Sequence, residues 1–209
     1  MTPRLFVATR NPGKQREIRA LLADAACEVM FPEDRGLWER PDEAGLEDAE
    51  SFEGNARRKA EYFAKLARFP TVAEDSGIEV FALGGKPGVR SKRFAFPPRE
   101  DLREQDEANN RELLVRLVGA PPERRRARYR CALVFLERHD ARPWVFEGQC
   151  TGRILETPTG SGGFGYDPIF FSDELGKSFG EATAEEKAAV SHRGRAFAAF
   201  AAWLAEHPL

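Results

Sequence analysis

Apolar residues follow two different periods along this chain, and each change of period marks a boundary between predicted elements. The short apolar run over residues 5–9 predicts a buried strand, and Arg10-Asn11-Pro12-Gly13 then supplies the residues of a tight loop. Behind the loop, apolar residues recur at helical spacing, at Ile18, Leu21, Leu22 and Ala25. The N-terminal segment is therefore predicted to be a strand, a glycine-containing loop and a helix.

The rest of the chain continues this alternation of strands and helices. Further strands are predicted over residues 28–31, 71–73, 127–137 and 144–155, and further helices over 51–66, through 110–117, from Thr183, and after Ser191. Alternating strands and helices predict an α/β protein. The two long strands before residue 156 alternate polar and apolar positions, which favours a mixed rather than a purely parallel sheet. We expect one domain over residues 1–209.

Composition narrows the class of protein. The chain has 209 residues, of which 42% are hydrophobic, and its formal net charge is −2. No apolar run approaches the roughly 20 residues of a membrane-spanning helix, and the balanced charge gives no general attraction to nucleic acid. The three cysteines, Cys27, Cys131 and Cys150, form no CxxC pair and predict reduced thiols. We therefore expect a cytoplasmic protein with neither a membrane nor a nucleic acid as partner.

The first loop is a candidate phosphate-binding site. A turn between a strand and a helix directs backbone N–H groups and the helix N-terminus at one point, which suits a phosphate. The loop lacks the GxxxxGK[ST] pattern of a Walker A motif, and an ordinary Asn-Pro-Gly turn is the alternative. The candidate residues are Thr9, Arg10, Asn11, Pro12, Gly13 and Lys14.

A second candidate is Glu74-Asp75-Ser76-Gly77, which we expect to end the strand that starts at Thr71. Ligands of open α/β sheets bind at such strand ends, and two adjacent acids can hold Mg²⁺ and orient a water. A polar turn with Gly77 in the left-handed conformation is the alternative. The acidic stretch 42–53 offers further carboxylates, and Lys59 on the second helix could face phosphates.

Two further segments suggest contacts with a planar base. The glycine-rich segment 160–168 allows close approach of its backbone to a ligand, and Phe164 and Tyr166 within it could stack on a ring. A flexible hairpin is the alternative. His192 and Arg193 could donate to keto oxygens from the start of the last helix, although a lone histidine is more often structural.

Together, six motifs in this order resemble the inosine/xanthosine triphosphate pyrophosphatase family. Each motif is weak alone, but the series spans nearly the whole chain, from Val7 to Phe197, and is highly specific. The motifs are A-T-x-N-x-x-K (8–14), S-F-x-x-N-A-x-x-K (51–59), E-D-S-G (74–77), G-x-x-S-x-R-[FY] (88–94), G-F-G-Y-D-P-x-F (163–170) and E-E-K-x-x-x-S-H-R-G (185–194).

The resemblance implies hydrolysis of noncanonical purine nucleoside triphosphates, ITP, dITP and XTP, to the monophosphate and pyrophosphate. It also implies a requirement for Mg²⁺, a homodimer, and an elongated mixed sheet in two lobes with a central active-site cleft. Two alternatives stay open: a pyrophosphatase for modified pyrimidine or methylated nucleotides, and a nucleotide sensor without turnover. The first would keep the phosphate-binding end and differ only at the base pocket, so a substrate panel distinguishes it. Tight binding without release of pyrophosphate would indicate the sensor, against which the intact Glu74-Asp75 and Lys14 argue.

The resemblance also implies a role for individual residues. Asp75 matches the family's catalytic acid, which binds metal and activates water. The segment 9–14 matches the triphosphate loop, Lys59 a phosphate contact and Ser76 a substrate contact. The residues that match the base-side pocket are Phe164, Gly165, Tyr166, Asp167, Lys187, His192 and Arg193.

Two positions depart from the family pattern. Arg10 stands where a small residue is usual, which places a bulky cation near the phosphates. The metal-binding glutamate, eight residues before the asparagine of the helix motif, is Glu47, but the threonine and glycine that usually follow it are absent. Glu43 and Glu50 are therefore rival metal ligands.

Overall fold

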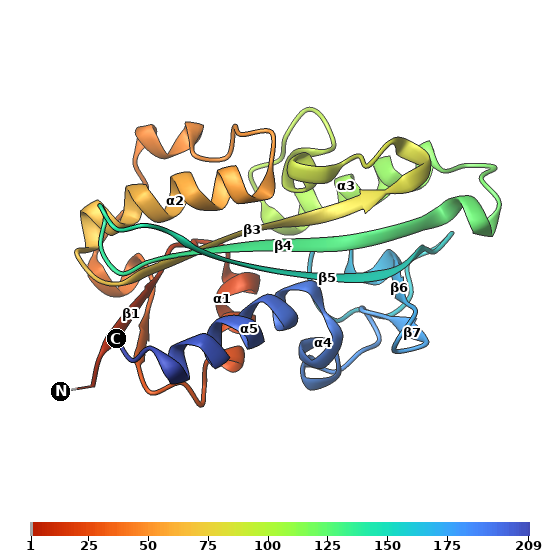
Figure 1. Cartoon of the computed structure of the whole chain (residues 1–209). Coiled ribbons are helices and arrows are strands. Elements are labelled where there is room, and N and C mark those ends of the chain that lie inside the picture. Colours follow the sequence, from red (N-terminus) through yellow and green to blue (C-terminus); the bar gives the residue numbers. More distant parts are fainter. Residues whose placement is uncertain (1) are drawn as a thin grey trace. The chain divides into compact units, whose positions relative to one another are not determined.

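The computed structural model describes residues 2–209, which divide into two compact units (Figure 1). The first unit holds the described residues up to Asp75 together with Cys131–Gly148 and Arg193–Leu209. The second holds Ser76–Arg130 and Gln149–His192. The expectation of one domain stays a prediction.

Seven strands form one open sheet in the order β2-β1-β3-β4-β5-β6-β7. Strand β1 pairs parallel with β2 and β3, whereas β6 pairs antiparallel with β5 and β7. The predicted α/β class with a mixed sheet is therefore confirmed. The strands are β1 (Arg4–Val7), β2 (Glu28–Met30), β3 (Thr71–Val80), β4 (Arg126–Leu136), β5 (Trp144–Ile154), β6 (Phe170–Ser172) and β7 (Lys177–Ser178).

In residues 2–209, five α-helices accompany the sheet, and side chains cap four of them, with Asp101 capping the third. Asn11 caps the first by accepting from the Lys14 amide at 3.0 Å, and Ser51 caps the second. Thr183 and Glu186 form the predicted capping box. The helices are α1 (Pro12–Leu21), α2 (Phe52–Ala67), α3 (Leu102–Arg116), α4 (Ala184–Val190) and α5 (His192–Glu206).

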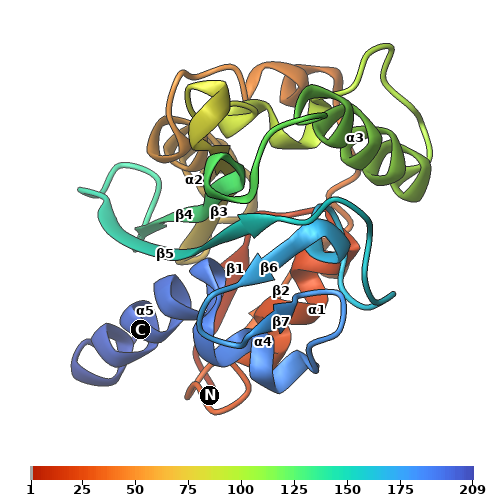
Figure 2. The ribbon, with the colours of Figure 1, turned by 90° about the vertical axis from the view of Figure 1, so that its right-hand side faces the viewer.

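In the first unit, helices cover both faces of the strands (Figures 1 and 2). Side chains of a strand alternate between its faces, so Leu5 and Val7 of β1 pack in one apolar cluster with α1 and α5. Phe6 and Ala8 pack in another cluster with α2. This two-sided burial explains why β1 reads as a continuous apolar run.

The second unit has its own core, built around aromatic rings. Tyr129 of β4 packs edge-on against Phe170, with ring centroids 4.8 Å apart, and its other neighbours include Phe179. The remaining buried members come from β3, β4, β5, α3 with its C-cap residue, and the short 3-10 turn before β6: Ile78, Val80, Leu113, Leu117, Ala127, Cys150, Ile154 and Ile169. Loop residue Tyr166 is buried in the same cluster, so this core anchors part of the glycine-rich segment.

The predicted end of the strand that starts at Thr71 is wrong. Strand β3 does not end at Ala73 but runs on to Val80, so Glu74 and Asp75 lie inside a strand and not in a turn after one. Gly77 is correspondingly not left-handed, since it is absent from the described glycines with positive φ. Residues 74–77 interrupt the apolar pattern of this strand in the sequence, and the pattern resumes at the buried Ile78.

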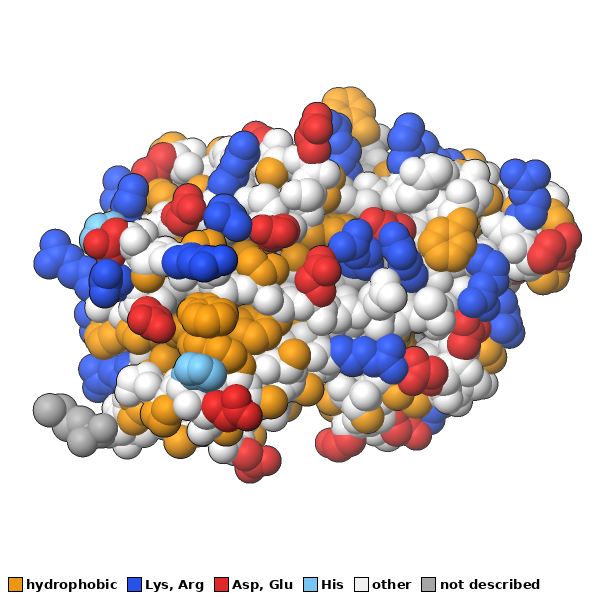
Figure 3. Space-filling view, in the orientation of Figure 1, with side chains coloured by type: hydrophobic (Ala, Val, Ile, Leu, Met, Phe, Trp, Pro, Cys, Tyr) orange, Lys and Arg blue, Asp and Glu red, His pale blue; other side chains and the backbone are white. Residues whose placement is uncertain are grey.

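The surface gives no field of a single charge on the face seen in Figure 3, where acidic and basic side chains are interspersed. This distribution agrees with the formal net charge of −2. Within residues 2–209, no helix is both long enough and apolar enough to cross a membrane.

Candidate active site

The continuation of β3 separates the two adjacent acids. Because neighbouring side chains of a strand point to opposite faces, Glu74 and Asp75 meet different elements. Glu74 pairs with Lys14 of α1 and Arg193 of α5, at 2.8 and 3.3 Å. Asp75 instead contacts residues of α2. The expectation that both acids hold one cation from a strand end is therefore wrong, and the two carboxylates have different partners.

Glu74 is the centre of a buried charge network. Its side chain is 1% exposed, and Arg193, which also donates to Glu17 of α1, is 3% exposed. Burial by itself would raise the pKa of Glu74, but the charges of Arg193, Lys14 and Lys59 outweigh it and hold that pKa well below its usual value. Glu74 is therefore ionised and holds Lys14 and Arg193 in place.

Asp75 is held on the other face by two polar groups from α2. Asn55 Nδ2 donates to Asp75 Oδ2 at 2.9 Å, and Lys59 Nζ lies 3.2 Å from Asp75 Oδ1. Asn55 and Lys59 are four residues apart, so they share one face of the helix. Asp75 is 6% exposed. Both carboxylate oxygens thus have fixed directions, which is the arrangement a general base requires.

Lys59 joins Asp75 to the acidic stretch. Its Nζ lies 2.8 Å from Glu47 Oε1 as well as near Asp75. Burial opposes the charge of Lys59, but Asp75 and Glu47 overcome it and raise the pKa of Lys59 above its ordinary value. Lys59 is therefore a permanent cation between two carboxylates.

Glu47 and Asp75 also fit a magnesium ion. One oxygen of each carboxylate lies near the same atom, the positively charged Nζ of Lys59. Carboxylate oxygen is the donor that Mg²⁺ takes, usually one or two carboxylates completed by water and substrate phosphate. In the described part of the chain, no group of three or more His, Cys, Asp or Glu side chains gathers as a metal site.

The two rival glutamates lie differently. Glu43 accepts two hydrogen bonds from Arg10, both at 2.8 Å, and Arg10 also donates to the Leu37 carbonyl at 2.7 Å. The hydrogen bonds to Glu43 raise the pKa of Arg10 above its ordinary value. Glu50 is exposed. Of the three candidates, only Glu47 is paired with the lysine that also pairs with Asp75.

The rest of the first loop follows the prediction of a helix-opening turn. Asn11 Oδ1 caps α1, Pro12 occupies its first turn, and Gly13 is buried there. The Asn11 amide donates to Thr9 Oγ1 at 3.3 Å. Lys14 reaches Glu74 from this turn, so a cation and the N-terminus of α1 lie together. That combination suits an anion.

The glycine-rich segment in the second unit is organised by Asp167. Its buried carboxylate accepts from the Phe164 amide at 2.8 Å and pairs with Lys187 of α4. Gly163 has φ +75° and a Cβ there would overlap Asp167, so only glycine fits. Lys187 Nζ lies 5.0 Å from the Phe164 ring centroid. The structure thus brings Phe164, Asp167 and Lys187 together.

The remaining predicted residues take different places. Tyr166 is buried, and its hydroxyl donates to the Ser91 carbonyl at 2.8 Å. The His192 ring stacks on Tyr129, with centroids 4.5 Å apart and planes 5° apart. Arg193 lies in the first unit with Glu74 and not in the second unit with Lys187. Ser76 follows Asp75 in β3 and is half-buried.

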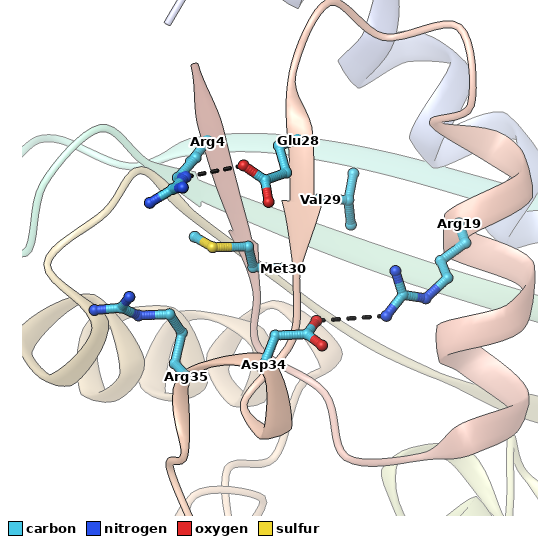
Figure 4. A pocket seen from close by; sticks show the side chains of 7 residues that line it. All are labelled: Arg4, Arg19, Glu28, Val29, Met30, Asp34 and Arg35. Atoms are coloured by element: carbon cyan, nitrogen blue, oxygen red, sulfur yellow. Dashed lines mark hydrogen bonds and ion pairs between the residues drawn. The ribbon is translucent and has the colours of Figure 1, made fainter. Parts of the chain in front are cut away.

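A cavity of about 420 Å³ opens elsewhere in the first unit, at the β2 edge (Figure 4). Exposed ion pairs Arg4–Glu28 and Arg19–Asp34, at 2.9 and 3.4 Å, line it. None of the predicted site residues belongs to it. The cavity therefore adds nothing to the candidate site.

Sequence reasoning missed several partners of these residues. The contact of Asn55 with Asp75 could have been suspected, because Asn55 belongs to the S-F-x-x-N-A-x-x-K motif and precedes Lys59 by four residues. Nothing in the sequence indicates the contacts of Glu17 and Asp106, since the partner of each lies far along the chain. Such contacts leave no local pattern in one sequence.

Known proteins with similar sequences were found for nearly the whole chain. The model of the Ham1 family matches residues 5–203. The dITP/XTP pyrophosphatase of Yersinia pestis is 45% identical over 195 residues, 92% of this chain and 93% of that protein. The dITP/XTP pyrophosphatase of Escherichia coli (strain K12) is 42% identical over the same shares.

Solved structures give the same answer. A HAM1 protein from Coxiella burnetii superposes with a TM-score of 0.83 at 30% identity, covering 98% of this chain and 99% of that one. The Ham1 protein of Staphylococcus aureus gives 0.79 at 33% identity, with the same coverage. The resemblance found in the motifs is confirmed: this chain belongs to the Ham1 family.

Proposed function

We propose that this protein hydrolyses the noncanonical purine nucleoside triphosphates ITP, dITP and XTP to the monophosphate and pyrophosphate. The observation that carries the mechanism is Asp75, whose two carboxylate oxygens are held by Asn55 and Lys59 beside Glu47. The names of the relatives, dITP/XTP pyrophosphatases, support the substrate class.

In this proposal Asp75 acts as the general base. Its carboxylate accepts a proton from a water whose oxygen attacks the α-phosphorus. As that bond forms, the bond from the α-phosphorus to the bridging oxygen breaks, and pyrophosphate leaves with the electron pair. A triphosphate carries about four negative charges, which Lys14, Lys59 and the N-terminus of α1 would balance. Arg10, with Thr9 to Gly13, belongs to the same predicted phosphate-binding loop.

Glu47 and Asp75 would hold Mg²⁺, whose bound form supplies positive charge to the phosphates and lowers the pKa of water. Lys59 already lies between these carboxylates and would move toward the phosphates or share them with the ion. Support for the metal comes from the donor chemistry of the two acids and from the family resemblance.

Base selection is proposed for the second unit. The Phe164 ring would stack on the purine, and the donors of Lys187 and His192 would meet its 6-keto oxygen, with Arg193 and Ser76 as further predicted contacts. Adenine presents an amino donor at that position, so buried donors would lose their partner at a cost of about 1–3 kcal/mol. Tyr166, Gly165 and Asp167 would shape the pocket around the ring.

Three broader expectations also stay predictions. We propose a homodimer on the family resemblance, and light scattering on the purified protein tests it. We propose a cytoplasmic location, which is supported by three cysteines that form no disulfide within residues 2–209. We propose that neither nucleic acid nor a membrane is a partner, in line with the mixed surface charge.

The decisive experiment is a substrate panel. Purified protein is incubated with Mg²⁺ and ITP, XTP, GTP or ATP, and pyrophosphate and orthophosphate are measured separately. We expect pyrophosphate from ITP and XTP, little from GTP or ATP, and none once EDTA removes the metal. Orthophosphate alone would mean attack at the γ-phosphorus and overturn the mechanism. Absence of any product would favour modified nucleotides as substrates, or a sensor.

Substitution of Phe164 tests the stacking contact. Stacking of a base on an aromatic ring contributes about 1–3 kcal/mol, so Phe164→Ala should raise the KM for ITP by roughly 5- to 100-fold with a smaller fall in kcat. Phe96→Ala is the matched control, because Phe96 is in the same unit and 90% exposed. A kcat that falls more than the KM rises would contradict base stacking.

A further inference from the structure

The backbone of Gly165 is held on both sides by side chains from outside its own loop. Its N–H donates to Asp106 Oδ2 at 2.7 Å, and its carbonyl accepts from Asn110 Nδ2 at 3.0 Å. Asp106 and Asn110 are four residues apart on α3, so they share one helix face. Both backbone polar groups of this one residue, which belong to the two peptide units on either side of its Cα, therefore meet side chains of a single distant helix.

The neighbouring residue is fixed in the same way. The Phe164 N–H donates to Asp167 Oδ2 at 2.8 Å, and the Phe164 carbonyl accepts from the Asp167 amide at 3.3 Å. All four backbone polar groups of Phe164 and Gly165 thus have a partner. Gly165 itself adopts φ +62°, a conformation that glycine takes freely and that a flexible loop would leave readily. The orientation of Phe164 depends on these hydrogen bonds.

We propose that Asp106 and Asn110 are positioning residues that hold the Gly165 backbone so that the Phe164 ring is preformed to receive the base. This inference rests on the proposed function for its ligand, a purine nucleotide. A side chain that is already held in its binding orientation loses little conformational entropy when the substrate binds, and the affinity is higher for that reason. The clamp therefore contributes to affinity for the base-bearing substrate and not to the chemical step.

Two features favour this role over simple packing of α3. A carboxylate that accepts an N–H makes a stronger hydrogen bond than a neutral acceptor does, although Asp106 is only half-buried. Asn110 Oδ1 is buried with no hydrogen-bond partner in residues 2–209, a cost that packing alone would avoid by an apolar side chain. The hydrogen bonds to Gly165 therefore explain these two polar side chains better than packing of α3 does.

The test compares three variants of α3 in the full-length protein. Asp106→Ala removes the acceptor, and Asp106→Asn keeps an oxygen in its place. Glu107→Ala is the control, since Glu107 is exposed and its carboxylate pairs with Arg103 of the same helix. We expect Asp106→Ala to raise the KM for ITP about 10-fold with kcat within about twofold of wild type. Asp106→Asn should restore most of the affinity, and Glu107→Ala should change neither constant.

Two further measurements separate positioning from general disruption. Inorganic triphosphate, which has no base, should inhibit Asp106→Ala as well as it inhibits wild type. Amide hydrogen exchange over residues 159–168 should be faster in Asp106→Ala alone. Three results for Asp106→Ala would each overturn the inference: a KM for ITP equal to that of wild type, inhibition by triphosphate weakened as much as the affinity for ITP, or amide exchange equal to that of wild type.

Failure of the proposed function is visible separately. If the wild-type protein releases no pyrophosphate from ITP or XTP, the proposed function is wrong whatever the variants do. Hydrogen exchange then decides whether α3 holds the loop, and unchanged exchange in Asp106→Ala would refute that as well. If wild type is active and only the variants fail to differ, the clamp alone is refuted.

Discussion

Replacing Asp75 by asparagine is expected to lower kcat for ITP by about 10²- to 10⁴-fold, the usual contribution of a general base. Asparagine keeps the shape of the side chain but does not accept a proton from water. Lys59 keeps Glu47 as a partner at 2.8 Å, so no buried cation is left without a counterion and the fold should persist. Pyrophosphate release under saturating ITP measures the effect.

Circular dichroism and a thermal melt establish that the Asp75→Asn protein is folded. Asp42→Asn is the matched control, because Asp42 is an exposed carboxylate that accepts from the Tyr62 hydroxyl at 2.9 Å and belongs to no part of the site. Its turnover should equal that of wild type. Wild-type turnover in a folded Asp75→Asn protein would remove Asp75 from the mechanism.

Glu74→Gln is expected to reduce the free energy of unfolding by about 3–5 kcal/mol at pH 7, as loss of one member of a buried charge network usually does. Lys14 and Arg193 both lose their shared counterion, although Arg193 still pairs with Glu17. Urea denaturation followed by fluorescence gives the difference. A loss below 1 kcal/mol would mean that water or another carboxylate replaces Glu74.

The same variant has a defined pH dependence. The pKa of Glu74 is lowered in the folded protein, so its ionised form adds stability that is complete above the unfolded value of about 4.3. That stability is lost as the pH falls through the lowered folded-state pKa. The gap between wild type and Glu74→Gln should therefore be constant from pH 7 to about 5 and shrink below that.

A surface carboxylate provides the comparison. Glu28 pairs with Arg4 at 2.9 Å, but about half of each side chain is exposed. Such pairs contribute about 0–1 kcal/mol, so Glu28→Gln should leave the urea midpoint nearly unchanged at every pH. A Glu28→Gln effect as large as that of Glu74→Gln would show that burial is not what makes the Glu74 network strong.

Local features of the fold could be predicted because their causes lie close together in the sequence. The turn before α1 follows from Asn11 and Pro12, and the capping box at Thr183 needs only residues three apart. Order of motifs along the chain was sufficient to indicate the family. In each case a short window of residues contains the whole physical reason.

What could not be predicted depends on residues far apart. The first half of α3 has no apolar periodicity, because its polar side chains bond to loops, and the predicted helix therefore began too late. The ion pair between Arg193 and Glu74 joins α5 to β3. No residue near Arg193 in the sequence indicates this contact, because its partner lies more than a hundred residues earlier.

The alternation of Glu74 and Asp75 also constrains how this protein can vary. A strand that shifts by one residue presents every side chain on the opposite face. A single-residue insertion or deletion inside β3 before Glu74 that shifts the rest of the strand would therefore exchange the two acids, placing Asp75 toward Lys14 and Glu74 toward Lys59. The number of residues in the strand before Glu74 thus decides which of the two acids faces Lys14.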